Sequence, residues 1–281
     1  MWKQTTLLFL CTVLLASCSL LDKDTVFTPV KATSVNLKKS IPIDFIPRPL
    51  HLVAVGDSLT EGIGDSTKQG GYLPYLASML EGDKGIREIE ITNFGKKGNR
   101  TEQLGNRLNS PEISSAIQNA DMVAITIGGN DIMSIVKDNI FRLELEVFQQ
   151  EKEDYVSRLE QIIQAVRQDN RDAAIVLIGV YNPFYYWFSE IEEMNKVVDE
   201  WNEATQRLIE QHPNTLFVEI DDIFLNNKEN LLFDDHFHPN DRGYELIAQR
   251  VFEELEDDAL KELSKRSYTV LKEESTQIDE E

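Results

Sequence analysis

Serine, histidine and aspartate side chains occur in this sequence where they could act together as a nucleophilic centre. Ser58 lies in the segment Gly-Asp-Ser-Leu at 56–59, directly after a short apolar run. A serine hydroxyl needs an adjacent base to become a nucleophile at neutral pH. Of the four histidines, His236 and His238 share one loop late in the chain, and Asp235 precedes His238 by three residues. In a tight loop this spacing can turn the carboxylate toward the imidazole, so Ser58, Asp235 and His238 are the candidate catalytic residues.

These residues need elements to bring them together, and the hydrophobic pattern predicts such elements. Apolar runs rich in β-forming residues alternate with helical periodicity at 155–166, 194–208 and 244–255. Alternating strands and helices predict right-handed crossovers and an α/β fold, a three-layer α/β/α arrangement around a five-stranded parallel sheet. The connection from 131 to 148 is long and mixed, with no assigned element. The expected strands are Leu52–Val55, Ile89–Asn93, Met122–Ile127, Ala174–Val180 and Thr215–Ile220.

The candidate residues all follow expected strands, where open α/β sheets bind their ligands. The segment at 181–188, after the fourth expected strand, holds six aromatic residues. Some of these rings could line a substrate groove, and the alternative is that they cap the core beneath a long loop. The candidates for substrate lining are Tyr181, Tyr185, Tyr186 and Trp187.

Four sequence blocks, taken together, resemble the SGNH/GDSL family of serine esterases and lipases over about 50 to 255. The Gly-Asp-Ser-Leu segment is the first block, and Gly98 after the second expected strand matches the second. Gly-Gly-Asn-Asp at 128–131 matches the third block, and Asp235 with His238 matches the last. Each block alone is a weak signal, but all four occur in the family's order. The resemblance implies the flavodoxin-like fold of SGNH hydrolases.

The resemblance also implies roles for these residues. Ser58 would attack an ester carbonyl, His238 would take its proton, and Asp235 would orient His238. The oxyanion would be held by the backbone N–H groups of Ser58 and Gly98 and by the side-chain amide of Asn130. The expected activity is hydrolysis of a carboxylic ester without a cofactor, and the substrate would be a lipid, a lysophospholipid or an acetylated carbohydrate.

Other interpretations of the same residues remain open. Gly98 could be only a turn glycine, and Asn130 with Asp131 could be only a helix N-cap. Asp57 likewise fits capping better than catalysis. The carboxylates and imidazoles at 234–238 are of the types that bind metals, but a serine centre needs no metal, so none is expected. On a larger scale, the chain could be a non-catalytic envelope lipoprotein that uses the same fold as a binding module.

The charge of the chain excludes some partners. The 281 residues carry a net charge of −21. Binding to nucleic acid requires clustered Lys and Arg against the phosphates, so nucleic acid is not an expected partner. Broad electrostatic attraction to anionic lipid is not expected either.

The N-terminus has the features of an exported lipoprotein. An apolar stretch at 7–16 is too short for a membrane span, and Leu-Ala-Ser-Cys at 15–18 resembles a bacterial lipobox. We therefore expect a signal peptide at 1–17, a lipid anchor on Cys18 and a location on the extracytoplasmic face of the cell membrane. The only other cysteine, Cys11, would be removed with the signal peptide. After removal of the signal peptide, we expect a tether at 18–49, a hydrolase domain at 50–264 and an acidic tail at 265–281.

Overall fold

Five parallel strands form one sheet in the order β2-β1-β3-β4-β5, which is the flavodoxin-like order. The computed structural model describes residues 48–82, 86–139, 145–184, 192–225, 227 and 229–256. This sheet confirms the expected α/β fold, and each expected strand is present with shifted ends. Residues 18–47 of the expected tether, including Cys18, lie outside the described residues, whereas 48 and 49 belong to the first strand. The end of the expected domain at 257–264, the acidic tail, Tyr185, Tyr186 and Trp187 also lie outside them. The strands are β1 Arg48–Gly56, β2 Ile86–Gly95, β3 Met122–Thr126, β4 Ala174–Ile178 and β5 Thr215–Val218.

Alternate side chains of the central strands point to opposite faces of the sheet, and both faces are buried. Val123 and Ile125 of β3 belong to one hydrophobic cluster, whereas Met122 and Ala124 belong to the other. Because β3 and β4 have no solvated face, their sequences are continuous apolar runs and not alternating ones, whereas the edge strand β2 is largely exposed. This explains why such runs marked the strands in the sequence.

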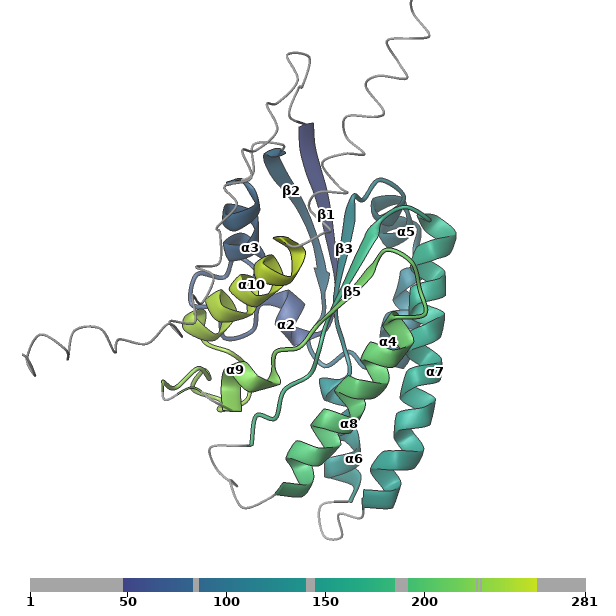
Figure 1. The fold of residues 1–281 in the computed structure, drawn as a ribbon, viewed down its shortest axis with the longest axis vertical. Helices are drawn as coiled ribbons and strands as arrows, with labels where there is room; N and C mark the ends of the chain where they lie inside the picture. The colour runs from purple at the N-terminus through teal and green to yellow at the C-terminus, as the bar shows by residue number, and fades with distance from the viewer. Residues whose placement is uncertain are drawn as a thin grey trace, which may run out of the picture. The chain divides into compact units, whose positions relative to one another are not determined.

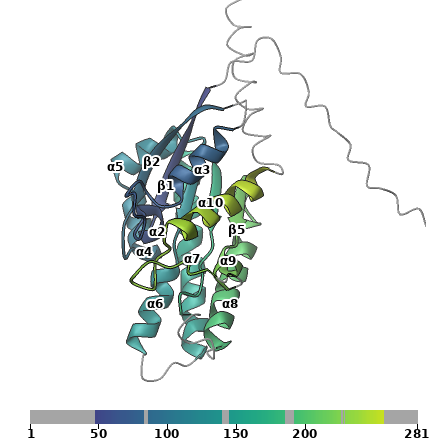
Figure 2. The same cartoon turned by 90° about the vertical axis from the view of Figure 1, so that its left-hand side faces the viewer.

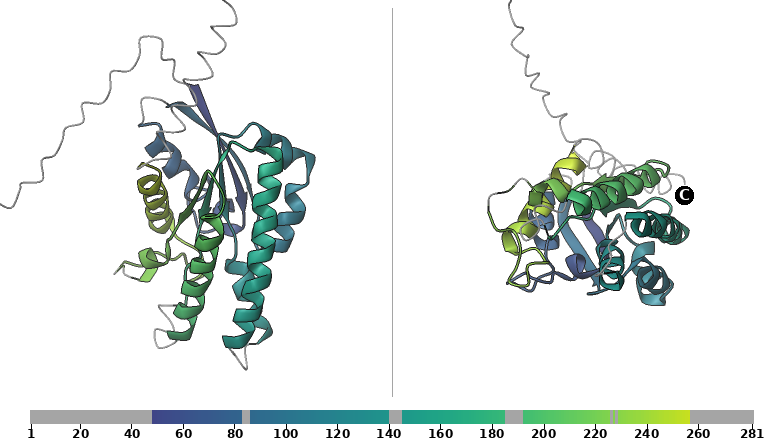
Figure 3. Two further views of the ribbon diagram at one scale, coloured as in Figure 1. Left: turned by 45° about the vertical axis from the view of Figure 1, so that its right-hand side comes forward. Right: turned by 90° about the horizontal axis from the view of Figure 1, so that it is seen from below.

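Helices cover the two faces unequally. The first cluster is completed by side chains of α4 to α8, and the second by side chains of α3, α9 and α10. Figure 1 shows α3 and α10 to the left of the sheet and α4 and α7 to its right, and the turned views agree (Figure 3). The helices are α2 Ser58–Glu61, α3 Leu73–Leu80, α4 Thr101–Leu108, α5 Pro111–Gln118, α6 Gly129–Asp138, α7 Leu145–Asp169, α8 Glu192–Ile209, α9 Asp221–Leu225 and α10 Asp241–Glu256.

Three of the helices on the larger side reach past the carboxyl ends of the strands. The 25 residues of α7 span about 38 Å at the usual helical rise, whereas the five residues of β4 span about 17 Å. In Figures 1 and 2, α6 and the first turns of α7 and α8 extend below the sheet. Residues of α6 and α8 border the cavity that contains Ser58.

Helix α6 occupies residues 131–138 of the connection from 131 to 148, to which the sequence pattern assigned no element. Ile132 and Ile135 are buried against the larger cluster, and Val136 packs beside them. Three apolar positions were too few for a periodic signal, so tertiary packing decides this helix. None of the helices in the described ranges has the length and apolar character required to cross a membrane.

Candidate active site

Ser58 is the first residue of the short helix α2, in a turn that is fixed to strand β3. The N–H of Asp57 donates to the carbonyl of Thr126 at 3.1 Å, and the Thr126 hydroxyl donates to the Asp57 carboxylate at 2.8 Å. Gly56 has φ +147, and a Cβ there would lie 2.2 Å from the Thr126 carbonyl oxygen. Only glycine allows this close approach of two strand ends, so the serine turn begins at a fixed position.

His238 lies in the loop between α9 and α10, and backbone hydrogen bonds close this loop on itself. Phe233 N–H donates to the His238 carbonyl at 2.7 Å, and Leu232 forms an isolated bridge with Pro239. A Cβ at Gly64, in the loop after Ser58, would lie 2.3 Å from the Pro239 carbonyl oxygen. The serine loop and the histidine loop therefore pack directly against each other.

This packing brings the three candidate catalytic side chains into one chain of hydrogen bonds. His238 Nε2 lies 2.9 Å from Ser58 Oγ, across 180 positions of sequence. His238 Nδ1 lies 2.6 Å from Asp235 Oδ2. Ser58 is 2% exposed and His238 is 6% exposed, so little water reaches the pair. The geometry is that of a nucleophile, a base and a group that orients the base.

Asp235 is the most solvent-accessible member of this chain. Partial burial acts to raise the pKa of its carboxyl, but hydrogen bonds from the His238 ring and from the N–H groups of His238 and Phe237 outweigh it. The pKa of Asp235 therefore lies below its usual value, and the carboxylate is charged at neutral pH. A charged acceptor on Nδ1 leaves Nε2 to face the Ser58 hydroxyl.

Asp57, next to Ser58, caps the helix as the sequence indicated. Its side chain accepts from the Leu59 N–H at 3.0 Å. Burial raises the pKa of Asp57 to about 7, and the hydrogen bonds from Thr126 and Leu59 offset the effect only in part. The Asp57 carboxyl accepts hydrogen bonds from the Leu59 N–H of α2 and from the Thr126 hydroxyl of β3. No hydrogen bond joins it to His238 in the described structure.

The expected oxyanion donors are placed less completely than the catalytic residues. Asn130 is half-buried and lines the same cavity as Ser58. One N–H of its amide donates to the Asn99 carbonyl at 3.0 Å, and an amide nitrogen carries a second N–H. Gly98 has φ +79 and is exposed beside Asn99. It is not among the residues that line the cavity. No contact joins Gly98 to Ser58 in the described residues, so its role as a donor stays a prediction.

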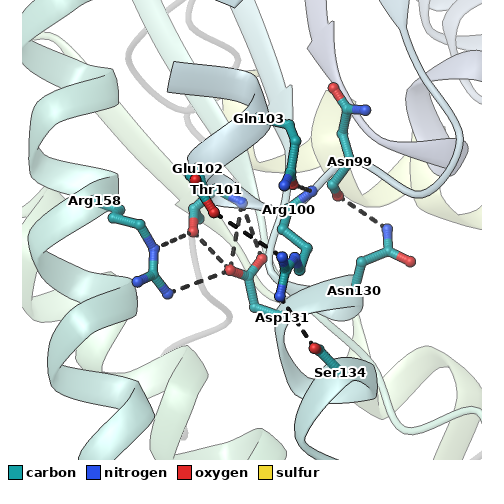
Figure 4. Close-up of polar contacts among 9 residues, drawn as sticks. All are labelled: Asn99, Arg100, Thr101, Glu102, Gln103, Asn130, Asp131, Ser134 and Arg158. Atoms are coloured by element: carbon teal, nitrogen blue, oxygen red, sulfur yellow. Dashed lines mark hydrogen bonds and ion pairs between the residues drawn. The ribbon is translucent and has the colours of Figure 1, made fainter. Parts of the chain in front are cut away.

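Asp131 does not cap its own helix, because Gly128 occupies the N-cap of α6. Its carboxylate instead accepts from the Thr101 N–H at 3.0 Å and from the Thr101 hydroxyl at 2.6 Å, at the start of α4. Arg158 of α7 donates to the same hydroxyl and pairs with Asp131 at 3.5 Å (Figure 4). Burial raises the pKa of Asp131 despite these partners. This cluster ties α4, α6 and α7 together directly beside Asn130.

A cavity opens beside Ser58, and most of its walls are apolar. It encloses about 590 Å³ of space, including the part that is open to solvent. The serine end is polar, with Asp57, Thr126 and Asn130. The other walls come from α6, from α8 and from the segment after β4. Their side chains include Ile132, Met133, Val180, Phe184, Met194 and Val198.

Of the four candidates for substrate lining, the structure describes only Tyr181. Tyr181 lines the cavity, but its ring is buried and stacks on Phe224, and its hydroxyl donates to the Phe237 carbonyl. Tyr185, Tyr186 and Trp187 lie outside the described residues. Sequence reasoning missed the walls from α6 and α8, since Met194 and its neighbours gave only a helical core signal.

A metal centre at 234–238 finds no support in the described structure. Asp235 is engaged with His238, and His236 has φ +55 in the loop and is exposed. Within the described ranges, no three His, Cys, Asp or Glu side chains are grouped so that they could hold a metal ion.

Comparison with solved structures shows the same fold in known esterases. The lipase Lip_vut3 from a goat rumen metagenome superposes with a TM-score of 0.62 at 24% identity, covering 72% of this chain and 95% of that one. Axe2, an acetylxylan esterase from Geobacillus stearothermophilus, gives a TM-score of 0.57 at 21% identity, covering 75% and 96%. At these identities the likeness concerns the fold.

Comparison of sequences shows the family. Over 214 residues the chain is 37% identical to the uncharacterized protein YpmR of Bacillus subtilis (strain 168), which covers 75% of this chain and 84% of that protein. It is 26% identical to the spore germination lipase LipC of Bacillus licheniformis, over 72% and 94% of the two chains. The model of the GDSL-like Lipase/Acylhydrolase family matches residues 54–246. The chain therefore belongs to the GDSL-like lipase/acylhydrolase family and is a carboxylic ester hydrolase.

Proposed function

We propose that this hydrolase works through a Ser58–His238–Asp235 triad. The observation that carries the proposal is the continuous chain of hydrogen bonds from Ser58 Oγ through the His238 ring to Asp235, at 2.9 and 2.6 Å. Ser58 Oγ attacks the ester carbonyl carbon while its proton passes to His238 Nε2. The imidazolium then donates this proton to the alcohol oxygen as the carbon–oxygen bond breaks, which leaves an acyl group on Ser58. Water attacks the acyl-enzyme by the same route and releases the acid.

Each tetrahedral intermediate carries an oxyanion that needs fixed donors. We assign this role to the backbone N–H groups of Ser58 and Gly98 and to the second N–H of the Asn130 amide. The position of Asn130 on the cavity wall next to Ser58 supports this assignment. An amide donates without adding a charge that would need to be neutralised on binding.

Hydrolysis of an activated ester tests the triad. On p-nitrophenyl esters, Ser58→Ala is expected to lower kcat by about 10⁴-fold or more, because the nucleophile is gone. Asn130→Ala removes one donor and is expected to lower kcat by about 10²–10³-fold. The matched control is Ser66→Ala, which alters a serine outside the triad and should retain activity. Wild-type activity in Ser58→Ala would end the proposal.

We also propose that the enzyme acts at the cell envelope, held by a lipid on Cys18. The proposal rests on the apolar stretch at 7–16 followed by Leu-Ala-Ser-Cys at 15–18. Mass spectrometry of the membrane-bound protein should find an N-terminal Cys18 that carries two or more acyl chains. Recovery of Cys18→Ala in the membrane fraction at the wild-type level would contradict it. The non-catalytic alternative is not favoured, since the chain is a member of a hydrolase family.

A further inference from the structure

The apolar part of the cavity has no role in the steps above, although it adjoins the reacting serine. Its walls are the first two turns of α6, with Ile132 and Met133, and the first two turns of α8, with Met194 and Val198. Val180 closes it at the end of β4. Val198 is 2% exposed and Met194 is 7% exposed, so both side chains are firmly held by the core on their other sides.

The chemistry of the walls selects one kind of ligand. The lining holds one acidic side chain, that of Asp57 at the serine end, and no basic one. The amide of Asn182, which also borders the cavity, is engaged with Asn195 and with the Phe184 N–H. Sugar hydroxyls placed against Ile132, Met194 and Val198 would lose their hydrogen bonds to water without replacement, which is unfavourable. A hydrocarbon chain in the same place gains free energy with each methylene that leaves water.

The position of the cavity relative to the triad decides which half of the ester enters it. The alcohol must leave from beside His238, because the imidazolium protonates its oxygen. The lining includes Ser58 and Asn130, and Phe237 beside the His238 ring, but not His238 itself, and most of the apolar lining comes from α6, α8 and the segment after β4. The group that lies toward Asn130 and away from His238 is the acyl group, whose carbonyl oxygen the oxyanion donors hold.

We propose that the space between α6 and α8 is an acyl-chain pocket, so that the enzyme prefers esters of linear acyl chains longer than acetyl. This inference rests on the proposed triad, because the triad defines the acyl side. Each methylene that enters the pocket should raise kcat/KM by up to about fourfold until the pocket is full. Val198, Met194 and Met133 then set the chain-length preference, and they take no part in the chemical step.

The test is the ratio of kcat/KM for p-nitrophenyl octanoate to that for p-nitrophenyl acetate. The wild type should favour octanoate by at least about tenfold, since several methylenes are buried. Val198→Phe fills the pocket and should lower the ratio by about tenfold or more. Val197→Phe is the matched control, because Val197 is the adjacent buried residue of α8 and does not line the cavity. Its ratio should stay within about twofold of the wild type.

A second variant covers the case in which a phenylalanine at 198 prevents folding. Met133 is only half-buried on α6, so Met133→Trp narrows the pocket with less strain on the core. Met133→Trp should also lower the octanoate-to-acetate ratio of kcat/KM. A wild-type preference for acetate, or an unchanged ratio in each folded pocket variant, would overturn the acyl pocket.

A binding measurement separates this inference from the proposed mechanism. Octanoate, the product acid, should raise the melting temperature of Ser58→Ala more than acetate does, because it occupies the pocket without any reaction. The added Val198→Phe or Met133→Trp change should remove the difference. If wild type and Ser58→Ala hydrolyse activated esters equally, the triad fails, and the melting temperatures still decide the pocket. Equal shifts by octanoate and acetate in Ser58→Ala would overturn the pocket even where hydrolysis is seen.

Discussion

Two kinds of carboxylate lie beside the reacting groups, and their surroundings are opposite. Asp235 is partly exposed and contacts His238, and hydrogen bonds keep its pKa low. Asp131 and Asp57 are buried, adjoin Asn130 and Ser58 in sequence, and have raised pKa values. The accessible carboxylate is the one that contacts the base, whereas the buried ones hold helix starts and strand ends. In this site, the buried acids hold the architecture, and the role that we propose in the chemistry belongs to the acid that contacts the imidazole.

The strongest test of this difference between the carboxylates is to remove the charge of Asp235 without changing the shape of its side chain. Asp235→Asn keeps the size of the side chain but removes the charge that holds His238 Nδ1–H and stabilises the imidazolium. We expect kcat to fall by about 10³-fold or more, with a melting temperature close to that of the wild type. Steady-state kinetics and a thermal melt measure both quantities. If kcat changed by less than about threefold, Asp235 would not be the group that orients the base.

A substitution at Asp131 should give the reverse result, a lower melting temperature with a smaller loss of kcat. Asp131→Ala leaves the buried Thr101 N–H and hydroxyl without their acceptor and leaves Arg158 without its carboxylate. The loss of such buried partners costs about 1–3 kcal/mol, which lowers the melting temperature by several degrees in a chain of this size. The loss of kcat in Asp131→Ala should be smaller than in Asp235→Asn, because Asp131 acts on the reaction only through the position of Asn130. An unchanged melting temperature with a 10³-fold loss of kcat would place Asp131 in the chemistry and remove the distinction.

A further contrast between the two kinds of carboxylate concerns pH and stability. Asp57 has its pKa raised from 3.8 to about 7, so the folded state holds a proton that the unfolded state has already lost between these values. Stability from this group therefore falls as pH rises from about 4 to 7. The pKa of Asp235 is lowered, so its effect on stability has the opposite pH dependence. Its contribution to the free energy of unfolding is lost as the pH falls through the pKa of the folded state. In Asp57→Asn, denaturant melts across pH 4 to 7 should show a flatter decline than in the wild type; an identical slope would contradict the raised pKa.

The sequence was sufficient for the parts of the molecule that depend on local pattern. The central strands β3 and β4 are buried on both faces and are continuous apolar runs, whereas the edge strand β2 is mostly exposed and mixes apolar with polar residues. The pattern was still enough to place five strands and their carboxyl ends. Ser58 and His238 could then be brought to one edge, because parallel strands end there. The structure confirms the sheet and shows the contact between the two side chains.

The parts that remained hidden depend on contacts between distant elements. The partner of Asp131 is the start of α4, thirty positions earlier in the chain, and the sequence alone suggested only a cap of its own helix. The acyl pocket joins α6 to α8, and one step along α8 separates Val198 on its wall from Val197 in the core. Periodicity identifies a buried face of a helix, but it does not say which buried positions border an opening.

The central claim is that His238 activates Ser58, and a fluorophosphonate probe measures this most directly. The probe forms a covalent bond only with an activated serine hydroxyl, so intact mass and peptide mapping should find one adduct, on Ser58. The adduct should be absent in Ser58→Ala and should form far more slowly in His238→Ala, because the base is gone. Labelling of Ser58 at the same rate in His238→Ala, or no labelling of the folded wild type, would contradict the account.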